Sequence, residues 1–257
     1  MSLFEELIED KVGDEKIVKS FKPKDILSNQ IFEEDGKSFV MREEIRKTLL
    51  KIADEFIDTL GVEFFIHDVV LTGSLSNYNW SEYSDFDLHI IIDLEQFDDK
   101  GEVYLKLFSA KKLIFNDKHN LTIKGYDVEV YPQDSKEKHT AEGQYSLMNS
   151  EWLVVPKKEK PPINKPKLKL KIDHWVEVVK KTLMTADKAS LKVAKEKMTK
   201  LSDKLRKFRK RGLETGGEFS NENLVYKYLR RSGLLDKIFN YQYKKRTKEL
   251  SIENEIY

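Results

Sequence analysis

The 257-residue sequence contains no cysteine, only six prolines and no long apolar run. Without cysteine the chain has no disulfide, no thiolate zinc site and no cysteine nucleophile, which is compatible with a reducing cytoplasm. No segment approaches the roughly 20 consecutive apolar residues that span a membrane, so we expect no membrane partner. The first ten residues, MSLFEELIED, are acidic and amphipathic, unlike a signal peptide. We therefore expect a cytoplasmic protein.

The chain as a whole also lacks an excess of charge of either sign, because 46 Lys and Arg offset 45 Asp and Glu. This balance hides a strong division. Residues 1–156 contain 18 basic and 32 acidic side chains, whereas residues 157–212 contain 20 basic and 6 acidic ones. Such asymmetry indicates a surface for nucleic acid or another polyanion. The sequence therefore predicts an acidic module followed by a basic one.

The scarce prolines mark the boundary between these modules. Four of the six lie close together, at Pro156, Pro161, Pro162 and Pro166. Because proline fixes φ and has no N–H group, this stretch is not expected inside a helix. We predict an extended Pro- and Lys-rich linker over 157–170, which joins a first domain over 1–156 to a helical domain over 171–257.

The first module contains both the three- to four-residue spacing of helices and the two-residue alternation of strands. Apolar residues at three- to four-residue spacing predict a helix over 42–60, and a second helix is expected over 102–116. Alternating or β-branched runs predict strands over 63–72, 85–93, 125–131, 144–148 and 151–155. The pattern leaves α/β and α+β open, and we adopt α+β with a mixed β-sheet and flanking helices.

The second module has only the helical periodicity. A five-residue step between Ala186 and Leu191 breaks the register of the apolar positions, which a helical hairpin or a kinked long helix would each explain. Gly212, Gly216 and Gly217 are expected to end this region. We predict a further helix from about 221 to 231 and a last one near 234–250.

The candidate chemistry lies in the segment LTGSLSNYNWSEYSDFDLHI, residues 71–90. Asp85, Asp87 and His89 share one face of a predicted strand because side chains alternate along a strand. Two neighbouring carboxylates repel each other, and a divalent cation such as Mg²⁺ with hard oxygen ligands resolves that repulsion. His89 has two alternative roles: it orients Asp87, or it only forms a hydrogen bond with a residue of a neighbouring strand.

The turn before this strand offers groups that suit phosphate. Gly73 and Ser74 end the preceding strand and supply backbone N–H groups and a hydroxyl, and we group Ser84, which precedes Asp85, with them as nucleotide-binding. The aromatic residues of the intervening loop, Tyr78, Trp80 and Tyr83, stack on a base or pack the loop onto the sheet; packing is favoured for at least two of them.

A third acid is expected on a neighbouring strand to complete a two-metal site. Asp127 and Glu129 share a face of the strand predicted over 125–131. We favour Glu129, because Val128 and Val130 flank it at the strand centre, and keep Asp127 as the alternative.

These motifs together resemble the DNA polymerase β-type nucleotidyltransferase superfamily, over residues 71–130. The stretches YNWSEYSDFDLHIIID, GYDVEVYPQDSKEKHTAEGQYSL and GEFSNENLVYKYLRRSGLLDKIF are similar to a nucleotidyltransferase family of tailed bacteriophages. The resemblance implies that Gly73 and Ser74 hold the triphosphate of an NTP, that Asp85 and Asp87 bind two Mg²⁺ ions, and that Glu129 binds one of them. Mn²⁺ is a substitute metal, and the location would be the host cytoplasm.

The acceptor of such a transfer is expected to meet the basic module. The densest basic run consists of Lys204, Arg206, Lys207, Arg209, Lys210 and Arg211. We interpret it as a polyanion-binding surface for an RNA or tRNA acceptor, against the alternative of a solvated helix face. Three functions follow: transfer of NMP to RNA; nucleotidylation of a protein or synthesis of an oligo- or cyclic nucleotide; and non-catalytic nucleic-acid binding.

Overall fold

The computed structural model describes residues 15–36, 38–97, 101–138, 141–158 and 163–250. The described residues divide into two compact units. The sheet unit lies within 22–160, and the helical unit combines residues 15–21 with residues 163–250. Each unit is described by itself below.

Within the described residues, the sheet unit contains a two-stranded hairpin and a six-stranded mixed sheet of order β5-β6-β4-β3-β7-β8. Its strands are β1 (Phe32–Asp35), β2 (Ser38–Met41), β3 (Ile66–Thr72), β4 (Asp85–Ile92), β5 (Thr122–Ile123), β6 (Tyr126–Asp134), β7 (Gln144–Ser146) and β8 (Glu151–Val154). Its helices are α3 (Glu43–Leu60), the short 3-10 turn η1 (Leu94–Gln96) and α4 (Glu102–Lys118). Strands β4 and β6 pair in parallel, and the other pairs are antiparallel. The α+β class and the mixed sheet are therefore confirmed.

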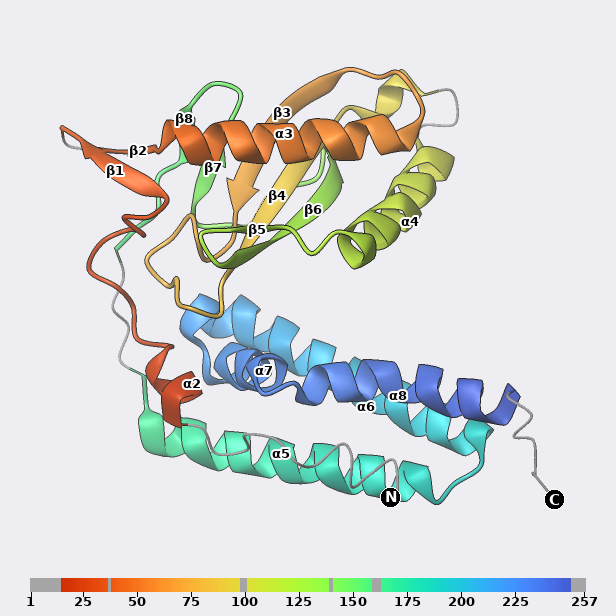
Figure 1. Ribbon diagram of the computed structural model, residues 1–257. Coiled ribbons are helices and arrows are strands. Elements are labelled where there is room, and N and C mark those ends of the chain that lie inside the picture. The colour runs from red at the N-terminus through yellow and green to blue at the C-terminus, as the bar shows by residue number, and fades with distance from the viewer. Residues whose placement is uncertain (1–14, 37, 98–100, 139–140, 159–162, 251–257) are drawn as a thin grey trace. The chain divides into compact units, whose positions relative to one another are not determined.

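Helices α3 and α4 pack on the same face of this sheet (Figure 1). Leu49 and Phe56 of α3 and Phe108 of α4 are buried against Leu88 of β4 and Val130 of β6. Burial of these apolar side chains is the main source of stability for the unit. Because side chains alternate along a strand, the polar residues of β4 and β6 fall on the opposite face of the sheet.

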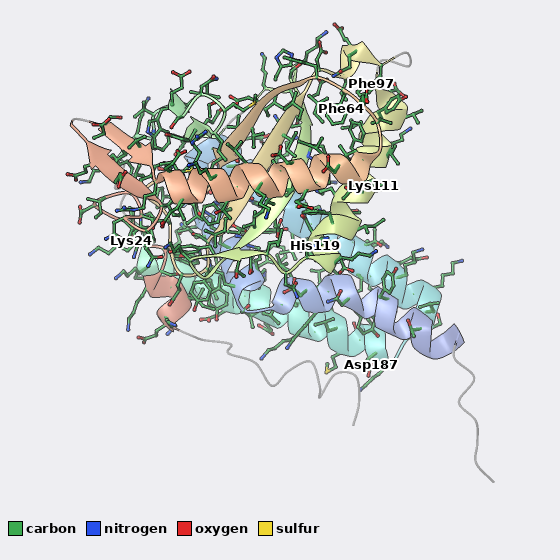
Figure 2. All side chains as sticks on the ribbon, turned by 45° about the horizontal axis from the view of Figure 1, so that its top comes forward. Lys24, Phe64, Phe97, Lys111, His119 and Asp187 are labelled. Carbon is green, nitrogen blue, oxygen red and sulfur yellow. The ribbon has the colours of Figure 1, made fainter. Side chains whose placement is uncertain are left out.

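Aromatic rings close the core where α4 begins. Phe64 and Phe97, labelled in Figure 2, have ring centroids 6.2 Å apart, and Phe108 lies 5.4 Å from Phe64 and 5.9 Å from Phe97. Tilted and edge-on contacts at these separations are the geometries that aromatic pairs favour. The cluster ties the loops around β3 and β4 to the helix that leads to β6.

The helical unit contains α2 (Glu15–Lys19), α5 (Lys165–Asp187), α6 (Leu191–Gly216), the 3-10 turn η2 (Gly217–Phe219), α7 (Asn221–Arg231) and α8 (Leu234–Leu250). A hairpin of α5 and α6, rather than one kinked helix, explains the slip in register. Helices α7 and α8 have the predicted bounds. Ser220 caps α7, since its side chain accepts a hydrogen bond from the N–H group of Asn223.

Two expected boundaries are wrong. The linker predicted over 157–170 is shorter, because α5 already begins at Lys165; Pro166 occupies the first turn of that helix, where an N–H group is not needed. Pro161 and Pro162 lie outside the described residues. Residues 15–21 belong to the helical unit rather than to a domain over 1–156. Arg231 of α7 donates a hydrogen bond to Ser20 at 2.6 Å and lies over the ring of Phe21.

Helix α6 ends at Gly216 with Gly217 as its C-cap, as predicted, but it continues through Gly212. A Cβ atom at Gly212 would lie 2.4 Å from the Cβ of Glu222 and 2.8 Å from the Oγ of Ser220. The residue is therefore glycine because the first turn of α7 crosses α6 at this point. Across the described part of the chain, no helix is long and apolar enough to span a membrane.

Candidate functional site

The parallel pair β4 and β6 gathers carboxylates on one face of the sheet. Asp85 is in register with Asp127, and Asp87 is in register with Glu129. The residues between them, such as Phe86 and Val128, are buried in the core on the other face. In a parallel pair, residues in register point to the same side of the sheet. The sequence-predicted acids from two strands therefore share one face, as expected.

The Gly73 turn brings Asp87 against the end of β3. Gly73 has a φ of +80°, a left-handed backbone conformation that residues other than glycine rarely adopt. A Cβ atom at this position would lie 1.9 Å from Oδ2 of Asp87. Thr72, the residue before Gly73, is also paired with Asp87 across β3 and β4. The carboxylate of Asp87 thus occupies the space that any other residue at position 73 would need.

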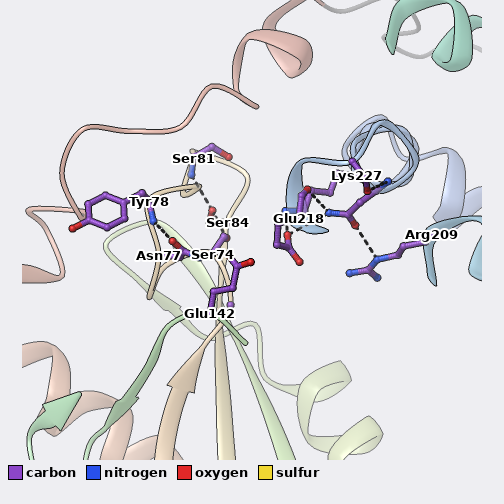
Figure 3. Close-up of polar contacts among 12 residues, drawn as sticks. Ser74, Asn77, Tyr78, Ser81, Ser84, Glu142, Arg209, Glu218 and Lys227 are labelled. Carbon is purple, nitrogen blue, oxygen red and sulfur yellow. Dashed lines mark hydrogen bonds and ion pairs between the residues drawn. The ribbon is translucent and has the colours of Figure 1, made fainter. Parts of the chain in front are cut away.

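Hydrogen bonds among serines fix the loop that joins β3 to β4 (Figure 3). The hydroxyl of Ser74 donates to the hydroxyl oxygen of Ser84 at 2.7 Å, and the backbone N–H of Ser81 donates to the same oxygen at 3.0 Å. The hydroxyl of Ser76 is within hydrogen-bonding distance of the carbonyl oxygens of Gly73, at 3.0 Å, and Gly143, at 2.9 Å. The structure therefore brings together Ser74 and Ser84, which the sequence analysis had grouped.

Two aromatic residues of this loop have a packing role. Tyr78 and Trp80 are partly buried against the hydrophobic core. The indole N–H of Trp80 donates to the carbonyl oxygen of Ile26 at 2.9 Å, and the ammonium of Lys24 lies 5.0 Å from the centre of the indole ring. The packing interpretation is confirmed for this pair.

Glu129 is held by a residue that the sequence interpretation overlooked. The hydroxyl of Tyr131, two residues further along β6, donates a hydrogen bond to Oε2 of Glu129. Burial raises the pKa of Tyr131, and the negative charges of Glu129, Asp87 and Asp85 raise this pKa further. The phenol therefore keeps its proton and acts as a donor. The alternation that placed Asp127 and Glu129 on one face also places Tyr131 there, which was the available signal.

The imidazole of His89 has a hydrogen-bonding partner on the neighbouring strand β6. Its Nδ1 atom lies 2.6 Å from Oε1 of Gln133, a buried residue of β6. The imidazole also stacks on the ring of Tyr131, with centroids 5.2 Å apart and planes 19° from parallel. These contacts place His89 on the same face of the sheet as the acids, beside Tyr131.

The donor set has the chemistry of a divalent-cation site but not its converged geometry. Carboxylate oxygens are the ligands that Mg²⁺ prefers, and Asp85, Asp87 and Glu129 supply them from adjacent strands. Among the described residues, however, no group of three or more Asp, Glu or His side chains is arranged to hold a metal ion. The ligand atoms of these residues therefore suit Mg²⁺, but their side chains would have to rotate to bring the oxygens together around one ion.

The basic run on α6 separates into two sets. Lys204 lies 5.3 Å from the ring centre of Trp175, Arg206 lies 5.9 Å from that of Phe239, and Arg209 lies 4.7 Å from that of Tyr226. These three cations pack along aromatic rings within the helical unit. Lys204 and Arg206 are nevertheless exposed. The second set, Lys207, Lys210 and Arg211, is also exposed and lies over no aromatic ring among the described residues, and we call it the α6 stripe. Of the six basic residues in the run, those of the stripe are the better placed to meet a polyanion.

A polar network at the junction of α6, η2 and α7 explains the position of Arg209 (Figure 3). Arg209 donates to Oδ1 of the fully buried Asn223 at 3.2 Å, and Nδ2 of Asn223 donates to the backbone oxygen of Glu218 at 2.7 Å. Lys227 forms an ion pair with Glu218 at 2.6 Å. Burial opposes the charge on Glu218, but Lys227 and Arg209 outweigh it and lower its pKa. Arg209 therefore belongs to this internal network rather than to the stripe.

No family model matches the chain, and no curated protein matches its sequence. A function must therefore be inferred from the acids of β4 and β6, the Gly73 turn and the α6 stripe.

Proposed function

We propose that this chain is a Mg²⁺-dependent nucleotidyltransferase of the polymerase β type, which transfers NMP from an NTP to a hydroxyl acceptor. The observation that carries the proposal is the contact between Asp87 and the Gly73 turn, beside in-register carboxylates on β4 and β6. A glycine turn whose backbone N–H groups are not shielded by a side chain, next to several carboxylates, combines donors for phosphate with ligands for the cation that neutralises it. Such a site suits phosphoryl chemistry.

Each residue then has a definite task. Asp85, Asp87 and Glu129 would hold the Mg²⁺ ions, which supply charge neutralisation for the attacking and leaving oxygens. Gly73 lets the phosphates approach the backbone, and the linked hydroxyls of Ser74 and Ser84 border the same turn. In the reaction the acceptor oxygen bonds to the α-phosphorus, the bond between the α-phosphorus and the bridging oxygen breaks, and pyrophosphate leaves. The acceptor proton passes to solvent.

Removal of divalent metal is expected to abolish NMP transfer. The purified chain is incubated with each of four α-labelled NTPs and with RNA, protein extract or no acceptor. We expect label to appear in one acceptor class with Mg²⁺, to disappear with EDTA, and to return with excess Mg²⁺ or Mn²⁺. Transfer that persists in EDTA, or the absence of any labelled product with every NTP and acceptor, would contradict the proposal.

RNA is the acceptor that the α6 stripe favours. Lys207, Lys210 and Arg211 are exposed cations at three- and four-residue spacing, so they lie together on one face of α6, where they can contact phosphates. Labelled protein in the same assay would instead indicate protein nucleotidylation, and a soluble product formed from NTPs alone would indicate oligo- or cyclic-nucleotide synthesis.

Replacement of all three stripe residues by alanine is expected to weaken RNA binding and its salt dependence. For single-stranded RNA the slope of log affinity against log salt changes by about 0.7 per phosphate contact, so three contacts predict a change of about 2. Fluorescence anisotropy over a salt series measures this slope. Because the stripe contributes no group to the acids of β4 and β6, we expect NTP binding to be unchanged.

A matched control removes the same charge elsewhere. Lys47, Lys51 and Lys118 are exposed on α3 and α4 of the sheet unit, and their replacement by alanine also removes three cations. This control is expected to leave the salt slope near that of the unmodified chain. Equal loss of RNA affinity in both triple variants would show that net charge, and not the stripe, determines binding.

A further inference from the structure

We infer that Tyr131 is a positioning residue that holds Glu129 as the third acid of the site, so that Glu129 and not Asp127 completes the metal-binding set. This inference rests on the proposed nucleotidyltransferase function and adds to it a residue outside the carboxylate motifs. The contacts of Glu129, of Tyr131 and of the side chains around the Tyr131 ring support it.

The tyrosine contacts the acid directly. Glu129 and Tyr131 are two residues apart on β6 and therefore on the same face. The Tyr131 hydroxyl donates to Oε2 of Glu129, which restricts the rotation of the carboxylate. A carboxylate fixed through one oxygen presents the other oxygen in a defined direction. A hydrogen-bonding partner of this kind commonly orients a metal ligand and sets its affinity.

The tyrosine ring is itself fixed from two elements. From β4, His89 stacks on the ring, and His89 is held by Gln133 at 2.6 Å. From α4, the ammonium of Lys112 lies 4.4 Å from the ring centre. One turn further along α4, Asn116 accepts a hydrogen bond from the N–H of Val130 and donates one to its carbonyl, each at 3.2 Å.

These contacts give Tyr131 a rigid frame. Asn116 ties α4 to the backbone of β6 next to Glu129, so the helix backbone that carries Lys112 is held beside the acid. His89 is in register with Tyr131 across β4 and β6, so the stacked pair follows from strand pairing itself. An acid held by a rigid donor is better placed for a ligand role than one that rotates freely.

Asp127 differs from Glu129 in each of these respects. Asp127 is exposed, and within the described residues its side chain has no hydrogen bond or ion pair. Its register partner is Asp85, at the start of β4, whereas Glu129 is paired with Asp87, whose carboxylate lies against the Gly73 turn. The acid paired with Asp87 beside the Gly73 turn is therefore the one that Tyr131 holds.

The test measures metal binding directly. Mn²⁺ is titrated into the full chain and free Mn²⁺ is followed by electron paramagnetic resonance. We expect Tyr131→Phe to weaken the affected Mn²⁺ site by about 10-fold or more, the usual cost of losing a partner of a metal ligand. Glu129→Gln is expected to weaken it at least as much, and Asp127→Asn to leave it near the unmodified value.

A double variant separates positioning from a structural effect. If Tyr131 acts through Glu129, then Tyr131→Phe makes no further difference to Mn²⁺ binding in the Glu129→Gln background. A purely structural role would instead weaken binding in both backgrounds and lower the melting temperature of both.

Three results would overturn the inference. They are unchanged Mn²⁺ binding in Tyr131→Phe, additive losses in the double variant, and a larger loss in Asp127→Asn than in Glu129→Gln. Each of these leaves the proposed function intact, provided that the unmodified chain binds Mn²⁺ and transfers NMP. A chain that binds no Mn²⁺ and transfers nothing would overturn both.

Discussion

The double variant Asp85→Asn/Asp87→Asn is expected to lower the rate of NMP transfer by about 10³-fold or more. Asparagine keeps the size of the side chain and one oxygen, but it removes the negative charges that bind the cation. A bound metal contributes several kcal/mol of charge stabilisation in the transition state, and each 1.4 kcal/mol corresponds to a factor of about ten. The measurement is single-turnover transfer from the preferred NTP with Mg²⁺ at saturation.

The same variant is expected to fold normally and to be at least as stable as the unmodified chain. Asp85 and Asp87 lie on the same face of β4, where removal of like charges relieves repulsion. The control is Asp54→Asn/Asp58→Asn, which makes the same charge change on the exposed side of α3. Full transfer activity in the Asp85/Asp87 variant, or equal losses in both double variants, would contradict the metal-based proposal.

The sequence allowed the sheet and its acids to be predicted because both depend on local alternation. In β4, the order of Asp85, Phe86, Asp87 and Leu88 alternates polar and apolar side chains, so the shared face of the two acids follows from strand geometry. The preference for Glu129 over Asp127 came from its central place in β6. It remains a prediction, which the Tyr131 contact supports.

The features that could not be predicted depend on long-range packing. The return of residues 15–21 to the helical unit depends on contacts such as Ser20 with Arg231, which are separated by 211 positions. The division of the basic run depends on which rings of α5, α7 and α8 lie beside α6, as with Trp175 and Lys204. A run of cations in a sequence does not show which of them pack on aromatic neighbours.

Gly73→Ala is the second substitution with a large expected effect, and we expect it to lower transfer about 10²-fold while the chain stays folded. The new Cβ atom would lie 1.9 Å from Oδ2 of Asp87, so the carboxylate must rotate away from the turn. Displacement of a catalytic group by about 1 Å can cost a factor of this size. Because Oδ2 is the far end of a side chain, the clash is relieved by rotation rather than by unfolding.

The backbone strain of this substitution can be separated from its effect on Asp87. Gly61 has a φ of +72°, close to the +80° of Gly73, but a Cβ atom there would have no atom within 4 Å beyond its own chain neighbours. Both alanine variants should therefore lose about 1–2 kcal/mol of stability from the left-handed conformation, as measured by urea unfolding. Only Gly73→Ala should also lose transfer activity and Mn²⁺ affinity. If the two variants had the same activity, the contact between Gly73 and Asp87 would have no part in the chemistry, and the phosphate-binding role of the turn would have to be abandoned.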